Sequence, residues 1–266
     1  MEVQSTRKII RVVQGHSEYA ERNVVEEYPL RLRVNGRELA TLICSSHQLN
    51  FLLAGFFSLQ GFIDSLDDIL SMGVCQEFGM AELRIRTELP ERLMPTLTSG
   101  CGTGIAYNLP QCLLDTGKQR LRSYCSEVLF CAMNELHGLT EQYQSHGGIH
   151  SAAIGDVGGV VLYAEDIGRH NTLDRLAGEA LFKGIDLQDK MLITSGRVST
   201  EMVAKAARLG IGLIASRTSP TDKAIELCEQ AGITMVGYLR GNSMEIYSHP
   251  EQLNISVVTT GLQIIK

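Results

Sequence analysis

The second half of the chain alternates short apolar runs with amphipathic segments, and this alternation is the feature that most restricts the possible folds. The intervening segments repeat apolar residues at helical spacing over ten or so positions. Strands that alternate with helices in this way form βαβ units, so the sequence predicts an α/β fold with a largely parallel sheet. The predicted strands are residues 149–154, 160–164, 191–194, 211–215, 233–239 and 244–247.

Three glycines mark the ends of the helices predicted in this half. Gly184, Gly210 and Gly232 each follow an amphipathic segment, and glycine is favoured just after the last turn of a helix. Ser199 is predicted to cap the second of these helices. Residues 219–222 predict a capping box for the third helix, with Pro220 at its first helical position.

The first part of the chain predicts a smaller α+β unit. An alternating strand at 27–34 leads into the turn Asn35-Gly36 and a second strand at 38–44. A helix should begin near Leu49, with Ser45 or Ser46 as its N-cap, and end at Gly61. Another strand follows at 81–87. We expect two domains, residues 1–97 and residues 98–266.

Composition and charge exclude several classes of protein. The chain has 266 residues, 20% charged residues and a net charge of −6, which disfavours a general nucleic-acid binder. Its longest apolar stretch, around 51–57, is far shorter than the roughly 20 residues of a membrane-spanning helix. The start lacks the apolar core of a signal peptide, and the seven cysteines suggest no disulfide framework. We therefore expect a cytoplasmic protein that binds neither nucleic acid nor membrane.

Cys101 is the first candidate for chemistry, because it lies in the glycine-rich run Thr98-Ser99-Gly100-Cys101-Gly102-Thr103-Gly104. A thiol flanked by glycines is accessible, and access is one requirement of a reactive thiolate. The alternative is an inert loop cysteine. Other cysteines stand in strand-like or helical patterns that favour burial: Cys44, Cys125, Cys131 and Cys228.

The histidines and cysteines do not form a recognisable metal site. His146 and His150 are close in sequence, but two glycines separate them and no C-x-x-C pair accompanies them. The signature of zinc deaminases is absent. We expect neither zinc nor any other bound metal ion of the protein's own.

Three predicted strand-to-helix loops each carry an arginine beside small or hydroxyl residues. The first contains Arg169, His170 and Asn171; the second contains Ser195 and Arg197; the third is residues 216–219. Helix N-termini at the carboxyl edge of a sheet bind anions, and arginine pairs with phosphate. The loops together predict a rim for a phosphorylated ligand of dinucleotide size. The alternatives are three ordinary capped helices, with Asn171 as a cap and Asp166 paired with Arg169. No Walker A or Rossmann motif is present.

Several long motifs, in order along nearly the whole chain, resemble the FdhD/NarQ family of formate dehydrogenase accessory proteins. The resemblance is carried by Glu165-Asp166-Ile167-Gly168-Arg169-His170-Asn171-Thr172-Leu173-Asp174, by 147–153, 195–199 and 219–221, by 237–241 with Ile246-Tyr247, and by Cys44 with 49–56 and 61–63.

This resemblance implies a cytoplasmic sulfurtransferase, expected as a homodimer. Such a protein takes persulfide sulfur from a cysteine desulfurase. It then passes the sulfur to the molybdenum bis(molybdopterin guanine dinucleotide) cofactor of formate dehydrogenase. The implied fold is a cytidine deaminase-like three-layer domain with a mixed sheet, without zinc, beginning with the Cys101 loop. Cys101 matches the family's persulfide cysteine. The family's cofactor-binding segment matches Met244, Glu245, Ile246, Tyr247, Ser248 and His249.

One departure from the family pattern affects the expected chemistry. Gly104 stands where the family's loop has a second cysteine, so this loop has no second thiol for a disulfide or a relay. Single-cysteine persulfide transfer remains compatible with the sequence. Two alternatives are a cofactor-binding chaperone without sulfur chemistry and a metal-free deaminase-like hydrolase.

Overall fold

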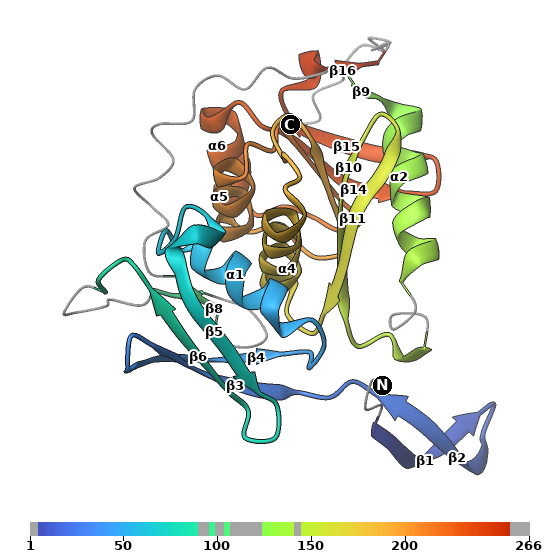
Figure 1. Cartoon of the computed structure of the whole chain (residues 1–266). Coiled ribbons are helices and arrows are strands. Elements are labelled where there is room, and N and C mark those ends of the chain that lie inside the picture. The colour runs from blue at the N-terminus through green and yellow to red at the C-terminus, as the bar shows by residue number, and fades with distance from the viewer. Residues whose placement is uncertain (1–4, 90–95, 99–103, 107–123, 141–144, 256–266) are drawn as a thin grey trace.

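A computed structural model describes residues 5–89, 96–98, 104–106, 124–140 and 145–255 of the chain (Figure 1). Within these residues, the larger part of the protein is a six-stranded sheet with helices on both faces. The strand order is β11-β10-β12-β13-β14-β15. The bounds are β10 His150–Asp156, β11 Gly159–Asp166, β12 Met191–Thr194, β13 Leu213–Ser216, β14 Thr234–Arg240 and β15 Ser243–Ser248.

The large sheet is mixed, and the expectation of a largely parallel sheet is wrong. Strand β12 is parallel to β13 and β13 is parallel to β14, whereas the other neighbouring pairs are antiparallel. The segments that connect the strands are the reason for this difference. Residues 157–158 and 241–242 are tight turns, which join only antiparallel neighbours, while a parallel pair needs a crossover helix.

Helices cover the two faces of the large sheet unequally. Helices α4 (Arg169–Lys183), α5 (Thr200–Arg208) and α6 (Asp222–Ala231) pack on one face, and α2 (Ser126–Leu139) packs on the other (Figure 1). The first core joins Ile154, Leu192 and Ile214 to α4, α5 and α6. The second joins the alternate residues Ala153 and Ile193 to α2. This two-sided burial explains why the strand sequences are continuously apolar.

The first part of the chain forms a separate sheet of order β4-β3-β6-β5, covered by α1 (Leu49–Leu59). The turn at Asn35-Gly36 lies where the sequence predicts it, with positive φ at both residues. The strands are β3 Tyr28–Val34, β4 Arg37–Cys44, β5 Ile69–Cys75 and β6 Met80–Ile85, with a 3₁₀ turn at Leu66–Asp68. The proposed boundary at 97–98 stays a prediction.

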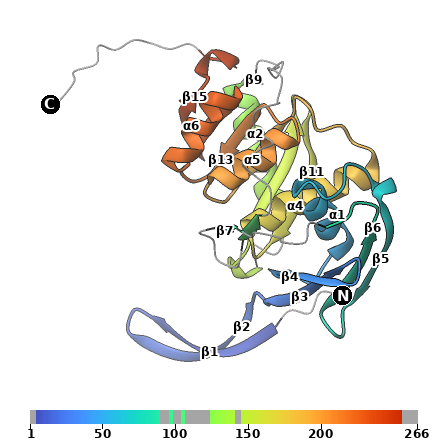
Figure 2. The same ribbon diagram turned by 90° about the vertical axis from the view of Figure 1, so that its left-hand side faces the viewer.

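Smaller elements complete the described fold. The hairpin of β1 (Ser5–Val13) and β2 (His16–Val24) extends away from both sheets (Figure 2). Four short strands and one 3₁₀ turn remain among the described residues. Strand β7 (Thr96–Thr98) pairs with β8 (Gly104–Ala106), and β9 (Tyr124–Cys125) pairs with β16 (Leu253–Asn254). The 3₁₀ turn is Pro250–Gln252.

Helix α1 crosses α4 at two glycines. This contact joins the part of the protein built on the four-stranded sheet to the part built on the six-stranded sheet. A Cβ at Gly55 would lie 1.7 Å from the carbonyl oxygen of Asp174, and a Cβ at Gly178 would lie 1.9 Å from that of Phe51. Only glycine at both positions lets the two backbones approach this closely. The first helix of the chain is thereby fixed against the helix whose N-terminus carries Arg169 and His170.

Candidate functional site

The three strand-to-helix loops singled out in the sequence lie at one edge of the large sheet. His150 pairs with Asp166, Ala152 pairs with Thr194, and Thr194 pairs with Ser216 in the strand registers. Strands β11, β12 and β13 therefore end side by side. The helices that follow them begin at the same edge, where ligands of α/β sheets usually bind.

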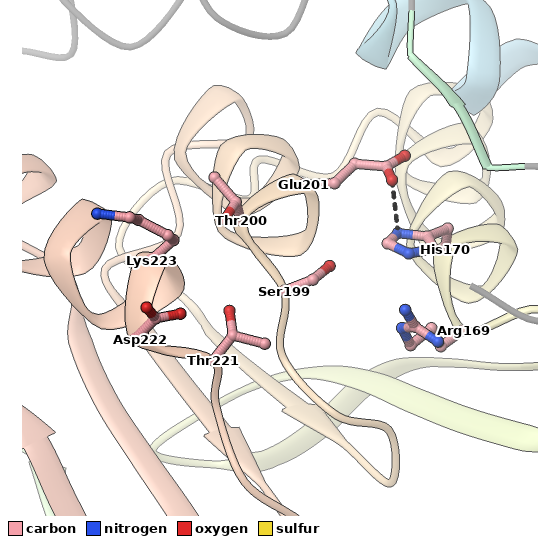
Figure 3. A pocket seen from close by; sticks show the side chains of 8 residues that line it. All are labelled: Arg169, His170, Ser199, Thr200, Glu201, Thr221, Asp222 and Lys223. Atoms are coloured by element: carbon pink, nitrogen blue, oxygen red, sulfur yellow. Dashed lines mark ion pairs between the residues drawn. The ribbon is translucent and has the colours of Figure 1, made fainter. Parts of the chain in front are cut away.

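A pocket of about 320 Å³ opens between the N-termini of α4, α5 and α6 (Figure 3). Each helix contributes its first residues. Since the partial positive charge of a helix is concentrated in its first turn, this arrangement favours ligands with an anionic part. The lining residues are Arg169, His170, Ser199, Thr200, Glu201, Thr221, Asp222 and Lys223.

Backbone hydrogen bonds hold the starts of α5 and α6 together. Val198 donates its N–H to the carbonyl of Ser219 at 3.2 Å, and Thr221 donates to the carbonyl of Val198 at 3.0 Å. Behind them, the Ser216 hydroxyl donates to the carbonyl of Gly196 at 2.7 Å. These hydrogen bonds hold the starts of α5 and α6 next to each other in the pocket wall.

Thr221, and not Ser219, caps α6. Its hydroxyl accepts the Ala224 N–H at 3.3 Å, so the capping box predicted at 219–222 is shifted by two residues and Pro220 precedes the helix. Ser199 occupies the N-cap position of α5 as predicted, but its side chain makes no capping hydrogen bond. Its buried hydroxyl oxygen has no hydrogen-bond partner among the described residues.

A chain of buried charged groups runs from the core to His170. Lys205 Nζ lies 2.9 Å from Asp174 Oδ1 and 3.5 Å from Glu201 Oε1. The other oxygen of Glu201 lies 3.4 Å from His170 Nδ1 (Figure 3). Burial lowers the pKa of Lys205, but the carboxylates of Asp174 and Glu201 raise it above its usual range overall. The ammonium group therefore stays charged and fixes both carboxylates.

His170 is a neutral imidazole at physiological pH. Burial lowers its pKa to about 3, although the Glu201 carboxylate opposes this shift, and the charges of Lys205 and Arg169 lower the pKa further. Both ring nitrogens are buried, and neither has a hydrogen-bond partner among the residues that the structure describes.

A second polar cluster lies behind the first loop and has a structural role. Asp166 accepts from Arg175 Nε at 2.8 Å and from the backbone N–H of Ser45 at 3.2 Å. Arg175 also donates to the carbonyl of Ser45 at 2.7 Å. Asn171 donates to Asp166 and to the carbonyl of Ile43. These bonds connect α4 to the loop after β4. The alternative pairing of Asp166 with Arg169 is wrong, since Asp166 pairs with Arg175.

The structure separates the residues proposed for the phosphate rim. Arg169 and His170 line the pocket. Asn171 is engaged with Ile43 and Asp166 and does not cap α4, whose N-cap is Gly168. The Ser195 hydroxyl accepts the N–H of Ser151 at 2.9 Å and so supports the start of β10. The side chain of Arg197 is exposed and is not part of the pocket wall.

The segment Met244–His249 runs away from the pocket edge. Ser243 pairs with Arg240 at the carboxyl end of β14, whereas Ser248 pairs with Met235 near its start. His249 Nε2 lies 3.1 Å from the carbonyl of Glu229, near the C-terminal end of α6. The role proposed for Met244, Glu245, Ile246, Tyr247, Ser248 and His249 stays a prediction, and these residues do not share a wall with Arg169 and His170.

The cysteines differ in exposure and in acidity. Cys101 lies outside the described residues. Cys44 and Cys228 are fully buried, as the sequence predicts, and burial raises the pKa of each thiol to about 12. Cys125 is half-buried, and Cys131 is exposed on α2, so its predicted burial is wrong. Cys131 is exposed because the buried face of α2 consists of Leu129, Ala132 and Leu136.

Sequence reasoning missed Glu201 and Lys223 as pocket residues. Both occupy the second position of a helix, and no motif marks them. Glu201 and Lys205 do have the i, i+4 spacing of an ion pair, which could have indicated their contact. Within the described ranges, no group of three or more His, Cys, Asp or Glu side chains is arranged to hold a metal ion. No helix among these residues is long and apolar enough to span a membrane.

Comparison of the sequence with known proteins identifies the family of this chain. The family model FdhD/NarQ matches residues 25–254. The chain belongs to the FdhD/NarQ family. A relative from Halalkalibacterium halodurans, named "Sulfur carrier protein FdhD", is 32% identical over 259 residues, which cover 94% of this chain and 96% of the relative. A protein of the same name from Staphylococcus aureus strain Newman is 35% identical over 235 residues, covering 86% and 88%.

A solved structure supports the fold of this FdhD/NarQ member. The crystal structure of a formate dehydrogenase accessory protein from Desulfotalea psychrophila superposes with a TM-score of 0.77 at 23% identity. The match covers 94% of this chain and 99% of that chain. The mixed α/β architecture expected from the sequence is confirmed. The cytidine deaminase-like label stays a prediction.

Proposed function

We propose that this FdhD/NarQ protein carries sulfur from a cysteine desulfurase to the guanine-dinucleotide molybdenum cofactor of formate dehydrogenase. The observation that carries the proposal is the identity of 32% and 35%, over most of each chain, to relatives named as sulfur carrier proteins. The neighbouring crystal structure, described as a formate dehydrogenase accessory protein, supports the destination of the sulfur.

Cys101 is the proposed carrier residue. Its thiolate attacks the terminal sulfur of the desulfurase persulfide. A new S–S bond forms on Cys101 as the old one breaks, and the desulfurase cysteine leaves as a thiolate. Cys44 and Cys228 are poor alternatives, because a pKa of about 12 leaves almost no thiolate at neutral pH. Releasing the sulfur as sulfide takes two electrons, which a second thiol outside the loop must supply, since position 104 is glycine.

Sulfur loading tests this role directly. The protein is incubated with a cysteine desulfurase and cysteine, and the intact mass is measured before and after reduction. We expect a gain of one sulfur atom that reductant removes and that Cys101→Ala abolishes. Cys131→Ala, which removes an exposed cysteine on α2, is the matched control and should load normally. Normal loading of Cys101→Ala would contradict the assignment.

The pocket is the proposed site for the phosphorylated part of the cofactor. Arg169 lines it beside three helix N-termini, and Lys223 stands at its other side (Figure 3). Losing a charge-assisted hydrogen bond costs about 1.5–3 kcal/mol, so Arg169→Ala should weaken guanine-nucleotide binding about tenfold or more. Arg197→Ala, at an exposed side chain outside the pocket wall, should have a smaller effect. Equal affinities of wild type and Arg169→Ala would reject this site.

A second function, a cofactor-binding chaperone without sulfur transfer, is favoured by one observation. Glycine replaces the second loop cysteine at position 104. The two functions separate in a strain that lacks the native protein. If Cys101→Ala still matures formate dehydrogenase while Arg169→Ala does not, the chaperone function is correct. Loss of maturation in Cys101→Ala supports the sulfur carrier.

A further inference from the structure

The hairpin of β1 and β2, residues 5–24, is an arm with one exposed apolar face. Alternate residues of a strand share a face, and the strand register places Ile10 opposite Tyr19, so Ile10, Val12 and Tyr19 lie together. These side chains are 62%, 63% and 89% exposed, and the arm extends away from both sheets (Figure 2). A two-stranded hairpin on its own is at best marginally stable in water. The apolar face of the arm therefore points to a surface on which it packs.

A second exposed apolar patch lies on the large sheet. Val161 and Tyr163 alternate along β11 on one face of the sheet, and Val157 lies in the turn before this strand; the three together are called the β11 patch, and all are exposed. Strand β11 is the last in the order of the sheet, so one side of its backbone has no strand partner among the described residues. Such edges are templates for pairing with another chain. The exposed Glu135 side chain of α2 borders the patch, where it accepts the N–H of Val160 at 2.9 Å.

Charge distinguishes the arm from the rest of the chain. The arm contains four Arg or Lys residues and two Glu residues, which gives it a net charge of +2. Because the whole chain has a net charge of −6, the remaining residues carry −8. Opposite charges bring complementary surfaces together and fix their register. Since the arm extends away from the sheets of its own copy, the acidic surface that it meets belongs to a second copy (Figure 2).

We propose that the apolar face of the arm packs on the β11 patch of a second copy, and that a twofold axis repeats this contact. Each copy then gives one arm and receives the other, which closes the assembly as a dimer. Stable interfaces use about 20–30 residues of each partner. One arm face offers fewer, and the repeated contact doubles the area. The arm precedes residues 25–254, which match the family model, so membership of the family assigns it no role.

Sedimentation of the full-length protein over a range of concentrations tests the contact. We expect the wild type to be a dimer at micromolar concentration. Tyr19→Glu places a charge in the apolar face of the arm, and Tyr163→Arg places one in the β11 patch. Each should raise the dissociation constant at least about a hundredfold, because both contacts of the dimer lose a central aromatic residue. His16→Glu is the matched control, since it adds the same charge as Tyr19→Glu on the opposite face of the arm and should leave the dimer intact.

Mixing the two variants tests whether arms are exchanged. Each variant alone lacks both contacts. In a mixed dimer, the arm of the Tyr163→Arg copy meets the intact patch of the Tyr19→Glu copy, and the two substitutions bring opposite charges together at the other contact. We therefore expect an equimolar mixture to form dimers with one copy of each, which native mass spectrometry detects.

Amide hydrogen exchange gives an independent measurement of the same contact. In the wild-type dimer, amides of residues 5–24 should exchange at least about tenfold more slowly than in Tyr19→Glu, because packing on the second copy suppresses local opening of the arm. His16→Glu should keep the slow exchange of the wild type. Equal exchange of the arm in the wild type and in Tyr19→Glu would show that the arm is stable without a second copy, and the inference would be wrong.

Other outcomes would also overturn it. A wild type that stays monomeric at high micromolar concentration excludes the dimer. A dimer that Tyr19→Glu leaves intact does not use the arm. A dimer that breaks in Tyr19→Glu but not in Tyr163→Arg uses another surface than the β11 patch, and failure of the mixture to assemble excludes exchange of arms. If Tyr163→Arg does not fold, Val161→Arg takes its place, because Val161 belongs to the same patch.

Discussion

The depressed pKa of His170 has a consequence for stability that does not depend on any ligand. Burial lowers this pKa from 6.5 to about 3 in the folded protein. Between these values the unfolded chain binds a proton that the folded chain does not. The free energy of unfolding contributed by His170 therefore rises with pH in this window and is lost as pH falls below about 6.5.

Comparison of the wild type with His170→Gln measures this contribution. Below pH 6.5, the wild type should lose about 1.4 kcal/mol per pH unit relative to the variant. Asp174, whose pKa burial raises to about 6, has the opposite pH dependence, but it is present in both proteins and cancels in the difference. Urea unfolding at pH 5 and pH 7.5 provides the two free energies. An unchanged difference between these pH values would show that His170 titrates normally.

Thiol reactivity should follow the burial of the described cysteines. Cys44 and Cys228 are buried and have pKa values raised to about 12, whereas Cys75 and Cys131 are exposed. Iodoacetamide at pH 8 should therefore alkylate the second pair at least about a hundredfold faster, because both thiolate formation and access favour it. Peptide mass mapping over time gives the rates. In guanidinium the four rates should converge; a difference that persists there would contradict burial as the cause.

Helix ends show where sequence reasoning succeeded and where tertiary contacts prevailed. The predicted glycines 184 and 232 are C-caps with positive φ, because this conformation is a local requirement that the sequence reveals. The predicted cap of α1, Ser45 or Ser46, is wrong, and Gln48 occupies that position. Ser45 accepts the N–H of Ile167 instead, more than 100 residues away in sequence. Such a partner cannot be inferred from local pattern.

The crossing of α1 and α4 gives a prediction about these two helices. Gly55→Ala places a methyl group on the carbonyl of Asp174, which belongs to a helix backbone and cannot rotate away. We expect destabilisation by at least about 1–3 kcal/mol, the usual effect of overpacking. Gly138→Ala is the control, since no atom lies within 4 Å of its Cβ position in α2. It should stabilise by about 0.5–1 kcal/mol through helix propensity. Denaturant midpoints measure both, and similar midpoints would refute the close contact.

At the level of the complete fold, the sequence indicated which segments meet but not how the strands pair. The loops at Arg169, Ser195 and Ser216 were expected at one edge, and the strand registers place them there. The strand directions are not predictable in this way, because an apolar strand such as 191–194 has the same sequence pattern whether its neighbours are parallel or antiparallel. The pocket's His170–Glu201 contact was also not predictable. It depends on how α4 and α5 are rotated on the sheet, which only packing decides.

A buried ion pair between α4 and the end of β11 also binds the loop after β4, and its removal should be strongly destabilising. Arg175 and Asp166 are about 1% exposed or less, and both also bind the loop at Ser45. Removing one partner of a buried pair leaves an uncompensated charge, so Arg175→Met should cost about 3–5 kcal/mol. Lys183→Met, which breaks the surface pair with Glu179, should cost less than about 1 kcal/mol. Thermal unfolding followed by circular dichroism compares the two variants. Arg175→Met removes the pair with Asp166 and the hydrogen bond to the carbonyl of Ser45 together, so a large loss of stability is expected. Equal effects of the two substitutions would contradict a stabilising role of the buried pair.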